Sequence, residues 1–200
     1  MTVLGADELN TDPFLLFNQW FAEAQLSEIN DPDAIALASV DADGMPSVRM
    51  VLLKEILPEG FVFYTNYTSR KSGELMATGK AAFVVHWKSL RRQIRVTGSV
   101  EQVPDAQSDV YYQTRSRGSR IGAWASQQSK PLQNRGELAA AVRKMEETYP
   151  DEVPRPPHWG GFLIRPAEIE FWADGDFRLH DRFRYTKDID GNWASQRLYP

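Results

Sequence analysis

The chain has 200 residues, 42% of them hydrophobic, which is enough for one domain with a substantial core. Its formal net charge of -4 and its pI near 5.5 argue against a general nucleic-acid-binding protein. The absence of cysteine excludes disulfides, thiolate metal sites and a cysteine nucleophile, and it favours a reducing, cytoplasmic location. The sequence also lacks a secretory leader and an apolar run of membrane-spanning length, so we expect no membrane partner.

Residues 1–200 are predicted to form a single domain that starts with a flexible polar arm at 1–11 and a helix at 12–26. Asp12-Pro13 supplies a capping carboxylate and a first-turn proline, and apolar residues recur behind it at helical spacing. Further helices are expected at 72–77, 104–112 and 134–149. Apolar runs bounded by turn residues predict strands at 34–40, 46–56, 61–64, 81–87, 93–103, 159–172, 177–185 and 193–198.

The connections between these strands indicate how they pair. Leu57-Pro58-Glu59-Gly60 and the stretch 188–192 are typical turns of β-hairpins, and most other strand pairs are also joined without a crossover helix. This favours an α+β fold with a mainly antiparallel sheet. A closed β-barrel with peripheral helices would hide the edges of a sheet with so many strands.

A first candidate anion site lies where the helix at 72–77 should begin. Ser69 or Thr68 can cap this helix, and Arg70 and Lys71 lie beside its N-terminus. Free backbone N–H groups, the helix dipole and two cations together suit a phosphate. Arg49 and Lys54, which bracket the preceding strand, extend this basic group. The alternative is that all four cations are solvated on the surface.

A second candidate anion site is formed by Tyr111, Arg115 and Ser119, which recur at a spacing of four residues. If the segment is one helix, a phenol, a guanidinium and a hydroxyl project from the same face. This set suits a phosphate monoester. An exposed helix with an incidental arginine is the alternative.

A third group of charges lies in the predicted strand at 177–185. Arg178, His180 and Arg182 alternate along it, so they should face the same side of the sheet. Three neighbouring cations repel one another, and such a row is expected against an anionic or electron-rich ligand. An exposed strand with acidic neighbours is the alternative.

Other common site motifs are missing from the sequence. The three histidines have no metal-ligand spacing, so we expect no metal. There is no nucleophile elbow, P-loop or Rossmann glycine motif. The stretch from Lys88 to Arg95 is basic and contains no acidic residue, which leaves an RNA-binding barrel as one alternative. We nevertheless expect no nucleic-acid partner.

Together these segments resemble the pyridoxine (pyridoxamine) 5'-phosphate oxidase family, flavin-dependent enzymes of vitamin B6 metabolism. The resemblance extends over nearly the whole chain, and it departs from the family at Tyr199, where alanine is usual. The motifs that carry it are Arg-Met-Val-Leu-Leu-Lys (49–54), Phe-Tyr-Thr-Asn (63–66), Ser-Arg-Lys (69–71), Arg-Gln (92–93), Ile-Gly-Ala-Trp-Ala-Ser-Gln-Gln-Ser (121–129), Trp-Gly-Gly-Phe (159–162), Ile-Glu-Phe-Trp (169–172) and Arg-Leu-His-Asp-Arg (178–182).

The resemblance implies an FMN-binding split barrel that works as a homodimer, with FMN at the subunit interface. It implies that Gln128, Ser129, Trp172 and Arg182 complete the flavin site from the other subunit. The remaining cofactor-binding residues by motif position are Arg49, Met50, Val51, Leu52, Leu53, Lys54, Tyr64, Thr65, Arg70, Lys71 and Gln93.

The resemblance also implies a reaction. Pyridoxine 5'-phosphate or pyridoxamine 5'-phosphate would pass a hydride from C4' to flavin N5, and O2 would take the electrons, giving pyridoxal 5'-phosphate and hydrogen peroxide. Lys54, Tyr111, Arg115 and Ser119 would bind the substrate phosphate. Arg178 and His180 would lie against the pyridine ring as the catalytic residues.

Two alternatives remain open within the flavoprotein interpretation. A related split-barrel oxidase that acts on a phenazine precursor would have no use for a full phosphate set at Tyr111, Arg115 and Ser119. A protein that only carries flavin or pyridoxal phosphate would bind the same ligands without turnover, and steady peroxide production would exclude it.

Overall fold

The computed structural model of the protein describes residues 11–200. The flexible arm expected at 1–11 therefore lies, apart from Thr11, outside the described residues. Each strand pairs with its neighbours in the antiparallel direction, in the order β3-β2-β1-β4-β5-β6-β7-β8. The strands are β1 (Ala34–Val40), β2 (Pro46–Leu57), β3 (Gly60–Asn66), β4 (Lys80–Trp87), β5 (Arg92–Gln102), β6 (Trp159–Ala173), β7 (Asp181–Lys187) and β8 (Trp193–Leu198).

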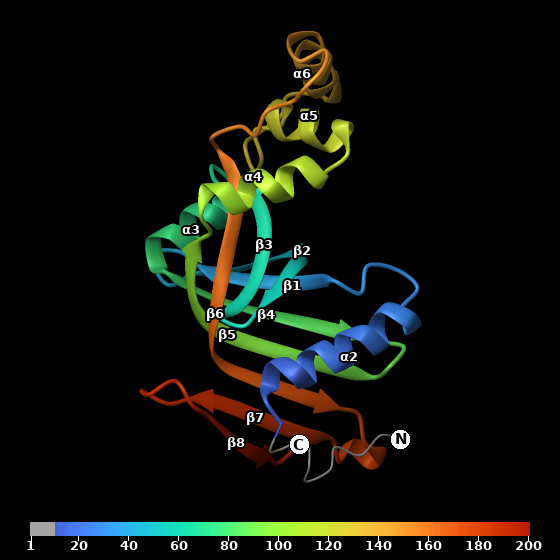
Figure 1. Ribbon diagram of the computed structural model, residues 1–200, viewed down its shortest axis with the longest axis vertical. Helices are drawn as coiled ribbons and strands as arrows, with labels where there is room; N and C mark the ends of the chain where they lie inside the picture. Colours follow the sequence, from blue (N-terminus) through green and yellow to red (C-terminus); the bar gives the residue numbers. More distant parts are fainter. Residues whose placement is uncertain (1–10) are drawn as a thin grey trace.

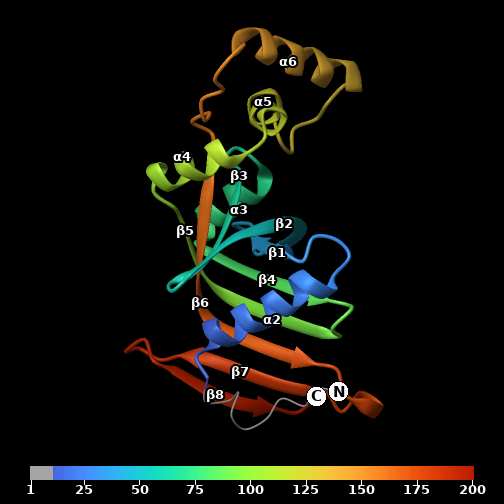
Figure 2. The same ribbon diagram turned by 45° about the vertical axis from the view of Figure 1, so that its right-hand side comes forward.

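The sheet closes on itself because β3 also pairs with β6. Strands β1 to β6 thus form a six-stranded antiparallel barrel, and the predicted α+β split-barrel fold is confirmed. The fifteen-residue strand β6 makes this possible: its first part, 159–164, pairs with β3, and its last part, 168–173, pairs with β7. Figures 1 and 2 show β6 running along the barrel, with β7 and β8 extending the sheet at one end.

The core lies inside the barrel and under helix α2 (Pro13–Ser27), which covers one open side. Asp12 caps this helix, since its Oδ1 accepts a hydrogen bond of 2.8 Å from the N–H of Phe14. Phe17 and Trp20 on the inner face of α2 are almost fully buried and pack against the rings of Phe61 and Phe171. Burial of aromatic side chains on this scale supplies much of the driving force for folding.

Four helices lie away from β7 and β8: α3 (Arg70–Thr78), α4 (Asp105–Thr114), α5 (Arg117–Ala125) and α6 (Arg135–Thr148). A short 3-10 turn, η1 (Asp176–Arg178), connects β6 to β7. In Figures 1 and 2, α4, α5 and α6 stack beyond the end of the barrel. No helix within residues 11–200 has the length and apolar character needed to cross a bilayer.

The structure corrects two local predictions. Tyr111, Arg115 and Ser119 do not share one helix, because α4 ends at Thr114 and α5 begins anew with Ser116 as its N-cap. Strand β7 begins only at Asp181, so Arg178 and His180 precede it and do not form a row with Arg182.

Candidate active site

A cavity of about 1030 Å³ opens beside the barrel, between β2, β3, α3 and the α4–α5 pair. This size is typical of a site for small molecules. Trp159, at the start of β6, also lines it. The predicted site residues in its lining are Arg49, Met50, Val51, Leu52, Lys54, Tyr64, Thr65, Arg70, Lys71, Tyr111, Arg115, Ser119, Gln128 and Ser129.

The other predicted site residues lie outside this lining. Leu53 is buried in the core, with 4% of its surface exposed. Gln93, Trp172, Arg178, His180 and Arg182 lie at the far end of β5, β6 and β7 and in the turn between β6 and β7. The structure thus brings the predicted residues together in two groups, not one.

Lys71 is a buried cation without an anionic partner. Only 7% of its surface is exposed, and its Nζ donates hydrogen bonds to Ser69 Oγ at 3.1 Å and Gln128 Oε1 at 2.8 Å. No carboxylate in the described part of the chain pairs with it. Burial, and then the charge of Arg49, lower the pKa of Lys71 from 10.5 to about 8. A buried ammonium with neutral partners is expected where an anion binds.

The N-terminus of α3 lies beside Lys71 and has no side-chain cap. Ser69 occupies the N-cap position, but its hydroxyl donates to Asn66 O at 2.8 Å instead of accepting from the helix. The prediction of capping by Ser69 or Thr68 is therefore wrong, because Thr68 also turns its hydroxyl to Asn66. The first-turn N–H groups stay available for an anion.

Arg49 is held in place by a buried carboxylate that the sequence analysis did not single out. Glu74 Oε2 lies 3.2 Å from Arg49 Nη2, and its other oxygen accepts from Arg70 Nε at 2.7 Å. Ser39 and Ser47 each bridge Arg49 and Glu74 through their hydroxyls. Burial raises the pKa of Glu74, but the hydrogen bonds outweigh it and hold this pKa at about 2.

Lys54 lies at a β-bulge, since the register between β2 and β3 shifts between Leu53 and Glu55. Bulges re-aim side chains, and here the extra residue joins the cavity wall. Its Nζ forms an ion pair of 2.6 Å with Asp33, and both side chains remain partly exposed. Lys54 is thus already paired, in contrast to Lys71.

Arg115 is the second cation in the cavity without an anionic partner. Its guanidinium carbon lies 4.6 Å from the centre of the Trp159 ring and 5.8 Å from that of Tyr112. Its Nη1 is buried and has no hydrogen-bond partner among the described residues. Burial lowers the pKa of Arg115. The ring faces hold the guanidinium while its N–H edge stays free, which is the edge that binds oxyanions.

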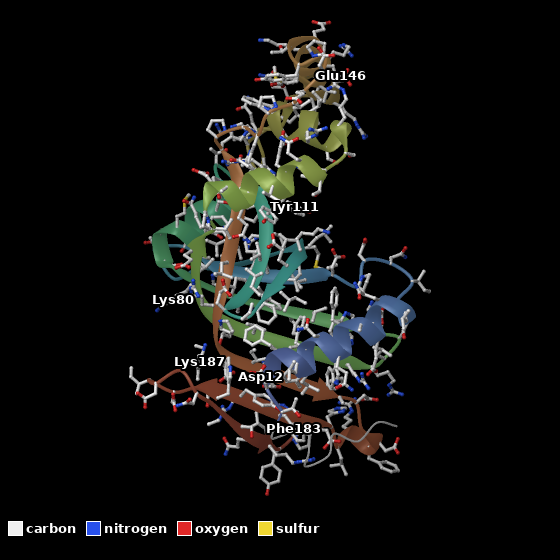
Figure 3. All side chains as sticks on the ribbon, in the orientation of Figure 1. Asp12, Lys80, Tyr111, Glu146, Phe183 and Lys187 are labelled. Atoms are coloured by element: carbon white, nitrogen blue, oxygen red, sulfur yellow. The ribbon has the colours of Figure 1, made fainter. Side chains whose placement is uncertain are left out.

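Tyr111 and Ser119 reach the same cavity as Arg115 despite the helix break. Tyr111 projects from α4 and stacks on the ring of Tyr64, with centroids 3.9 Å apart. Figure 3 labels Tyr111 beneath α4, on the side of the barrel. Ser119, in the first turn of α5, accepts a hydrogen bond of 2.9 Å from Ser116. All three residues line one cavity, and the turn at Arg115 and Ser116, not a shared helix face, brings them there.

The second group is organised by the buried carboxylate of Glu170. Arg182 binds both of its oxygens at 3.0 Å, and Arg95 also pairs with it. Burial raises the pKa of Glu170, but these arginines outweigh it and lower the pKa. Gln93, Trp172 and Arg182 lie side by side in the register of β5, β6 and β7.

His180 and Arg178 flank this second group. The His180 ring packs on Trp172 with centroids 4.6 Å apart, and its Nδ1 lies 3.1 Å from Asp174 Oδ1. Arg178 is exposed. Phe177 and Arg178 both have positive φ angles, of 55° and 66°, which non-glycine residues rarely adopt.

Comparison with known proteins identifies the family. Residues 21–149 match the family described as pyridoxamine 5'-phosphate oxidase, and residues 159–200 match the pyridoxine 5'-phosphate oxidase C-terminal dimerisation region. The chain belongs to the pyridoxamine 5'-phosphate oxidase family. This confirms the resemblance and the expectation of an oxidoreductase, and the dimerisation region supports a homodimer.

Relatives agree with the family over almost the full length. The pyridoxine/pyridoxamine 5'-phosphate oxidase of Cereibacter sphaeroides is 60% identical over 190 residues, which cover 94% of this chain and 95% of the relative. The protein of the same name from Brucella canis is 56% identical over 193 residues, covering 96% and 95%.

Two solved structures share the fold. PhzG from Burkholderia lata 383, in complex with tetrahydrophenazine-1-carboxylic acid, has a TM-score of 0.92 and 33% identity, covering 99% of this oxidase-family chain and 98% of PhzG. An FMN-binding, pyridoxamine 5'-phosphate oxidase-related protein from Nostoc punctiforme PCC 73102 has a TM-score of 0.79 at 17% identity, covering 96% and 100%.

Proposed function

We propose that this protein oxidises pyridoxine 5'-phosphate or pyridoxamine 5'-phosphate with O2 and FMN. Oxidation of the alcohol gives pyridoxal 5'-phosphate and hydrogen peroxide, and the amine additionally takes up water and releases ammonia. The relatives that carry this name, at 56% to 60% identity over nearly the full length, support the substrate class.

The observation that carries the proposal is the pair of unpartnered cations in one cavity. Lys71 on α3 is buried, and Arg115 between α4 and α5 is half-buried with its Nη1 fully covered; neither has a carboxylate partner in residues 11–200. FMN and the substrate each carry one phosphate, so the reaction needs two anion sites close together. A cavity for a neutral ligand would have no use for two such charges.

FMN fits the Lys71 side of the cavity. Lys71, the uncapped N-terminus of α3 and Arg49 would bind its phosphate, and the Glu74 network would keep Arg49 in position. Gln128 and Ser129 of the same chain would contact the flavin, because they line the cavity beside Thr65. When bound, FMN supplies the redox chemistry by accepting a hydride from C4' of the substrate.

The substrate phosphate fits the Arg115 side. Arg115 would present its free N–H edge, Tyr111 and Ser119 would donate hydroxyl hydrogen bonds, and Lys54 would add charge from the bulge in β2. Anchoring the phosphate far from C4' orients the reacting carbon, and such positioning contributes up to roughly 7–11 kcal/mol to catalysis in the best cases.

Arg178 and His180 would reach the pyridine ring from the second subunit of a homodimer. They lie outside the cavity of their own chain, together with Gln93, Trp172 and Arg182. The exposed apolar side chains of Val48, Met50 and Leu52 on β2, at the rim of the cavity, are suited to contact with another subunit.

Spectroscopy of the purified protein tests the function directly. We expect flavin absorption near 450 nm that pyridoxamine 5'-phosphate bleaches without oxygen and that air restores with release of peroxide. Tightly bound flavin that no phosphorylated B6 vitamer bleaches would contradict the proposal.

A mixed dimer tests the shared site. Arg115→Gln disables the cavity and Arg178→Ala disables the second group, so each homodimer should be inactive. A dimer purified with one copy of each keeps one intact site, and we expect about half of the wild-type turnover from the symmetry of a two-fold dimer. An inactive mixed dimer would place Arg178 and the cavity of one chain in the same site.

A second candidate function comes from the likeness to PhzG, whose structure contains a tricyclic carboxylic acid. Arg115 would bind a carboxylate as well as a phosphate. Tyr111 and Ser119 favour the phosphate, because with Arg115 they would offer three groups to one anion. Turnover of tetrahydrophenazine-1-carboxylic acid but not of pyridoxamine 5'-phosphate would establish this alternative instead.

A further inference from the structure

An aromatic cluster with three parallel rings lines the cavity at the proposed substrate-phosphate site. The rings of Tyr64 and Tyr111 stack at 3.9 Å with an angle of 8° between their planes. Trp159 is parallel to both within 9°, at 5.5 Å from Tyr64 and 6.2 Å from Tyr111. These rings come from β3, α4 and β6, so their alignment depends on how the helix is fixed to the barrel.

Glu55 of β2 joins the ring of Tyr64 to helix α4. Its Oε1 accepts a short hydrogen bond from the Tyr64 hydroxyl, and its Oε2 accepts one of 2.9 Å from Gln107 Nε2. Gln107 and Tyr111 are one turn apart on α4, so they lie on the same side of that helix. One carboxylate therefore fixes both members of the Tyr64–Tyr111 stack.

The Tyr64 hydroxyl is a donor in this arrangement and does not ionise. Burial and the hydrogen bond to Glu55 raise the pKa of Tyr64 far above its ordinary value. Because a phenol beside a carboxylate keeps its proton, the link between β2 and β3 persists throughout the neutral range.

Arg115 is held by a different set of contacts. Its guanidinium lies over the ring of Trp159 and near that of Tyr112, and no hydrogen bond or ion pair joins it to Glu55 or Gln107 in the described part of the chain. Loss of Glu55 should therefore displace Tyr111 while Arg115 keeps its position. The consequence is a partial weakening of phosphate binding.

We propose that Glu55 is a positioning residue that sets selectivity for a phosphorylated substrate. Through Tyr64 and Gln107 it places the Tyr111 hydroxyl within the phosphate site, although Glu55 itself is outside the cavity lining. This inference rests on the proposed function, because it assigns the anion at Tyr111 and Arg115 to the substrate phosphate.

Helix α4 is also anchored by residues that do not contact the Tyr64–Tyr111 stack. Arg155 donates to Asp105 at 2.7 Å and to Asp109 at 2.6 Å, and it also binds Trp159 O. These ion pairs fasten α4 outside the cavity lining. Asp105→Asn is thus a matched control that loosens the helix without touching the Tyr64–Tyr111 stack.

The test compares the FMN-loaded wild type with Glu55→Leu, Glu55→Gln and Asp105→Asn. Calorimetry measures the affinity for 4-deoxypyridoxine 5'-phosphate and for 4-deoxypyridoxine, which differ only in the phosphate. We expect Glu55→Leu to weaken the phosphorylated ligand about tenfold, as for one lost hydrogen bond to a charged group, and to leave the other ligand unchanged. Glu55→Gln can rebuild both hydrogen bonds and should restore most of the preference.

Equal weakening of both ligands, an unchanged preference in Glu55→Leu, or the same loss of preference in Asp105→Asn would each overturn the proposal. If Glu55→Leu does not fold, Tyr64→Phe replaces it, because this variant keeps the ring and removes only the hydroxyl. A wild type without preference for the phosphorylated ligand would refute the proposed function itself. The affinities of the wild type alone test the proposed function, whereas the affinities of the variants test the role of Glu55.

Discussion

Replacement of Lys71 by methionine should stabilise the flavin-free protein while abolishing flavin binding. Methionine has a similar length and no charge, so it fills the space of the lysine stem without a buried ammonium. The wild-type lysine has neutral partners only, in Ser69 and Gln128. Its charge therefore destabilises the fold until an anion is bound.

The size of the effect follows from the pKa of Lys71. Each pKa unit is equivalent to about 1.4 kcal/mol, so the decrease from 10.5 to about 8 corresponds to about 3 kcal/mol against the folded state. Loss of the two hydrogen bonds made by Nζ offsets about half of this. We expect a net gain of about 1–2 kcal/mol, which raises the melting temperature by about 2–8 °C in a protein of this length.

The pH dependence gives the sign of the effect. Between pH 8 and 10.5 the unfolded chain binds more protons at Lys71 than the folded chain, so wild-type stability should rise with pH in this window. The difference in the free energy of unfolding between Lys71→Met and the wild type should be largest below pH 8 and vanish towards pH 10.5. Urea unfolding of both flavin-free proteins at pH 7 and pH 10 measures it, with the exposed Lys80→Met as the control.

Two results would refute this reasoning. A variant that is less stable than the wild type at pH 7 would mean that Lys71 is satisfied by its neutral partners. A stability gain that persists at pH 10 would mean that packing, not charge, causes it. Flavin absorbance of the reconstituted variant completes the assay, because a variant that still binds FMN tightly would remove Lys71 from the phosphate site.

Three further predictions concern other charged residues. Glu74→Gln should destabilise the protein by about 3 kcal/mol, because it removes the buried carboxylate that pairs with the partly buried Arg49 and with Arg70. In the wild type, the stability contributed by Glu74 should be lost as pH falls from 4.5 to about 2, which acid unfolding measures. Arg115→Lys should raise KM for pyridoxamine 5'-phosphate by about tenfold to a hundredfold through loss of the planar guanidinium, with less effect on pyridoxamine. Arg178→Ala should lower kcat while the yellow FMN complex remains intact, and loss of flavin together with activity would move Arg178 into the cofactor site.

The strands were predictable because alternation and turn residues are local signals. The strand expected at 34–40 coincides with β1, and most other strand boundaries agree within two residues. The barrel was also predictable, because a large antiparallel sheet has exposed edge strands that closure into a barrel removes. The pairing of β3 with the first part of β6 closes it over a separation of about a hundred residues, and no local signal specifies that register.

The errors arose where the chain changes direction. A four-residue spacing predicts one helix face at Tyr111, Arg115 and Ser119, but Ser116 caps a new helix and its hydroxyl accepts from the N–H of Ser119. Alternation likewise predicted a strand through Arg178, where the backbone instead enters the left-handed region. In both cases a change of chain direction lies inside the predicted element, at Arg115 and Ser116 and at Phe177 and Arg178, and periodicity alone does not place such a turn.

The residues that sequence analysis missed hold the side chains of the candidate site in position. Glu74, Ser39 and Ser47 hold Arg49, and Glu55 links Tyr64 to Gln107. None belongs to a motif with a recognisable spacing. Their roles depend on contacts between β1, β2, α3 and α4 that only the folded chain creates.

The local instabilities of this fold lie where ligands and a second subunit are proposed to bind. Lys71 and the Nη1 group of Arg115 are buried without anions, and Phe177 and Arg178 have positive φ angles in an exposed turn. Such features persist only when the rest of the structure determines them. Ligands that bind only the folded state stabilise it by mass action, which offsets the free energy lost at these residues. The phosphates of FMN and substrate would neutralise the two cations, and a partner subunit would cover the turn, so the assembled enzyme should be considerably more stable than the isolated chain.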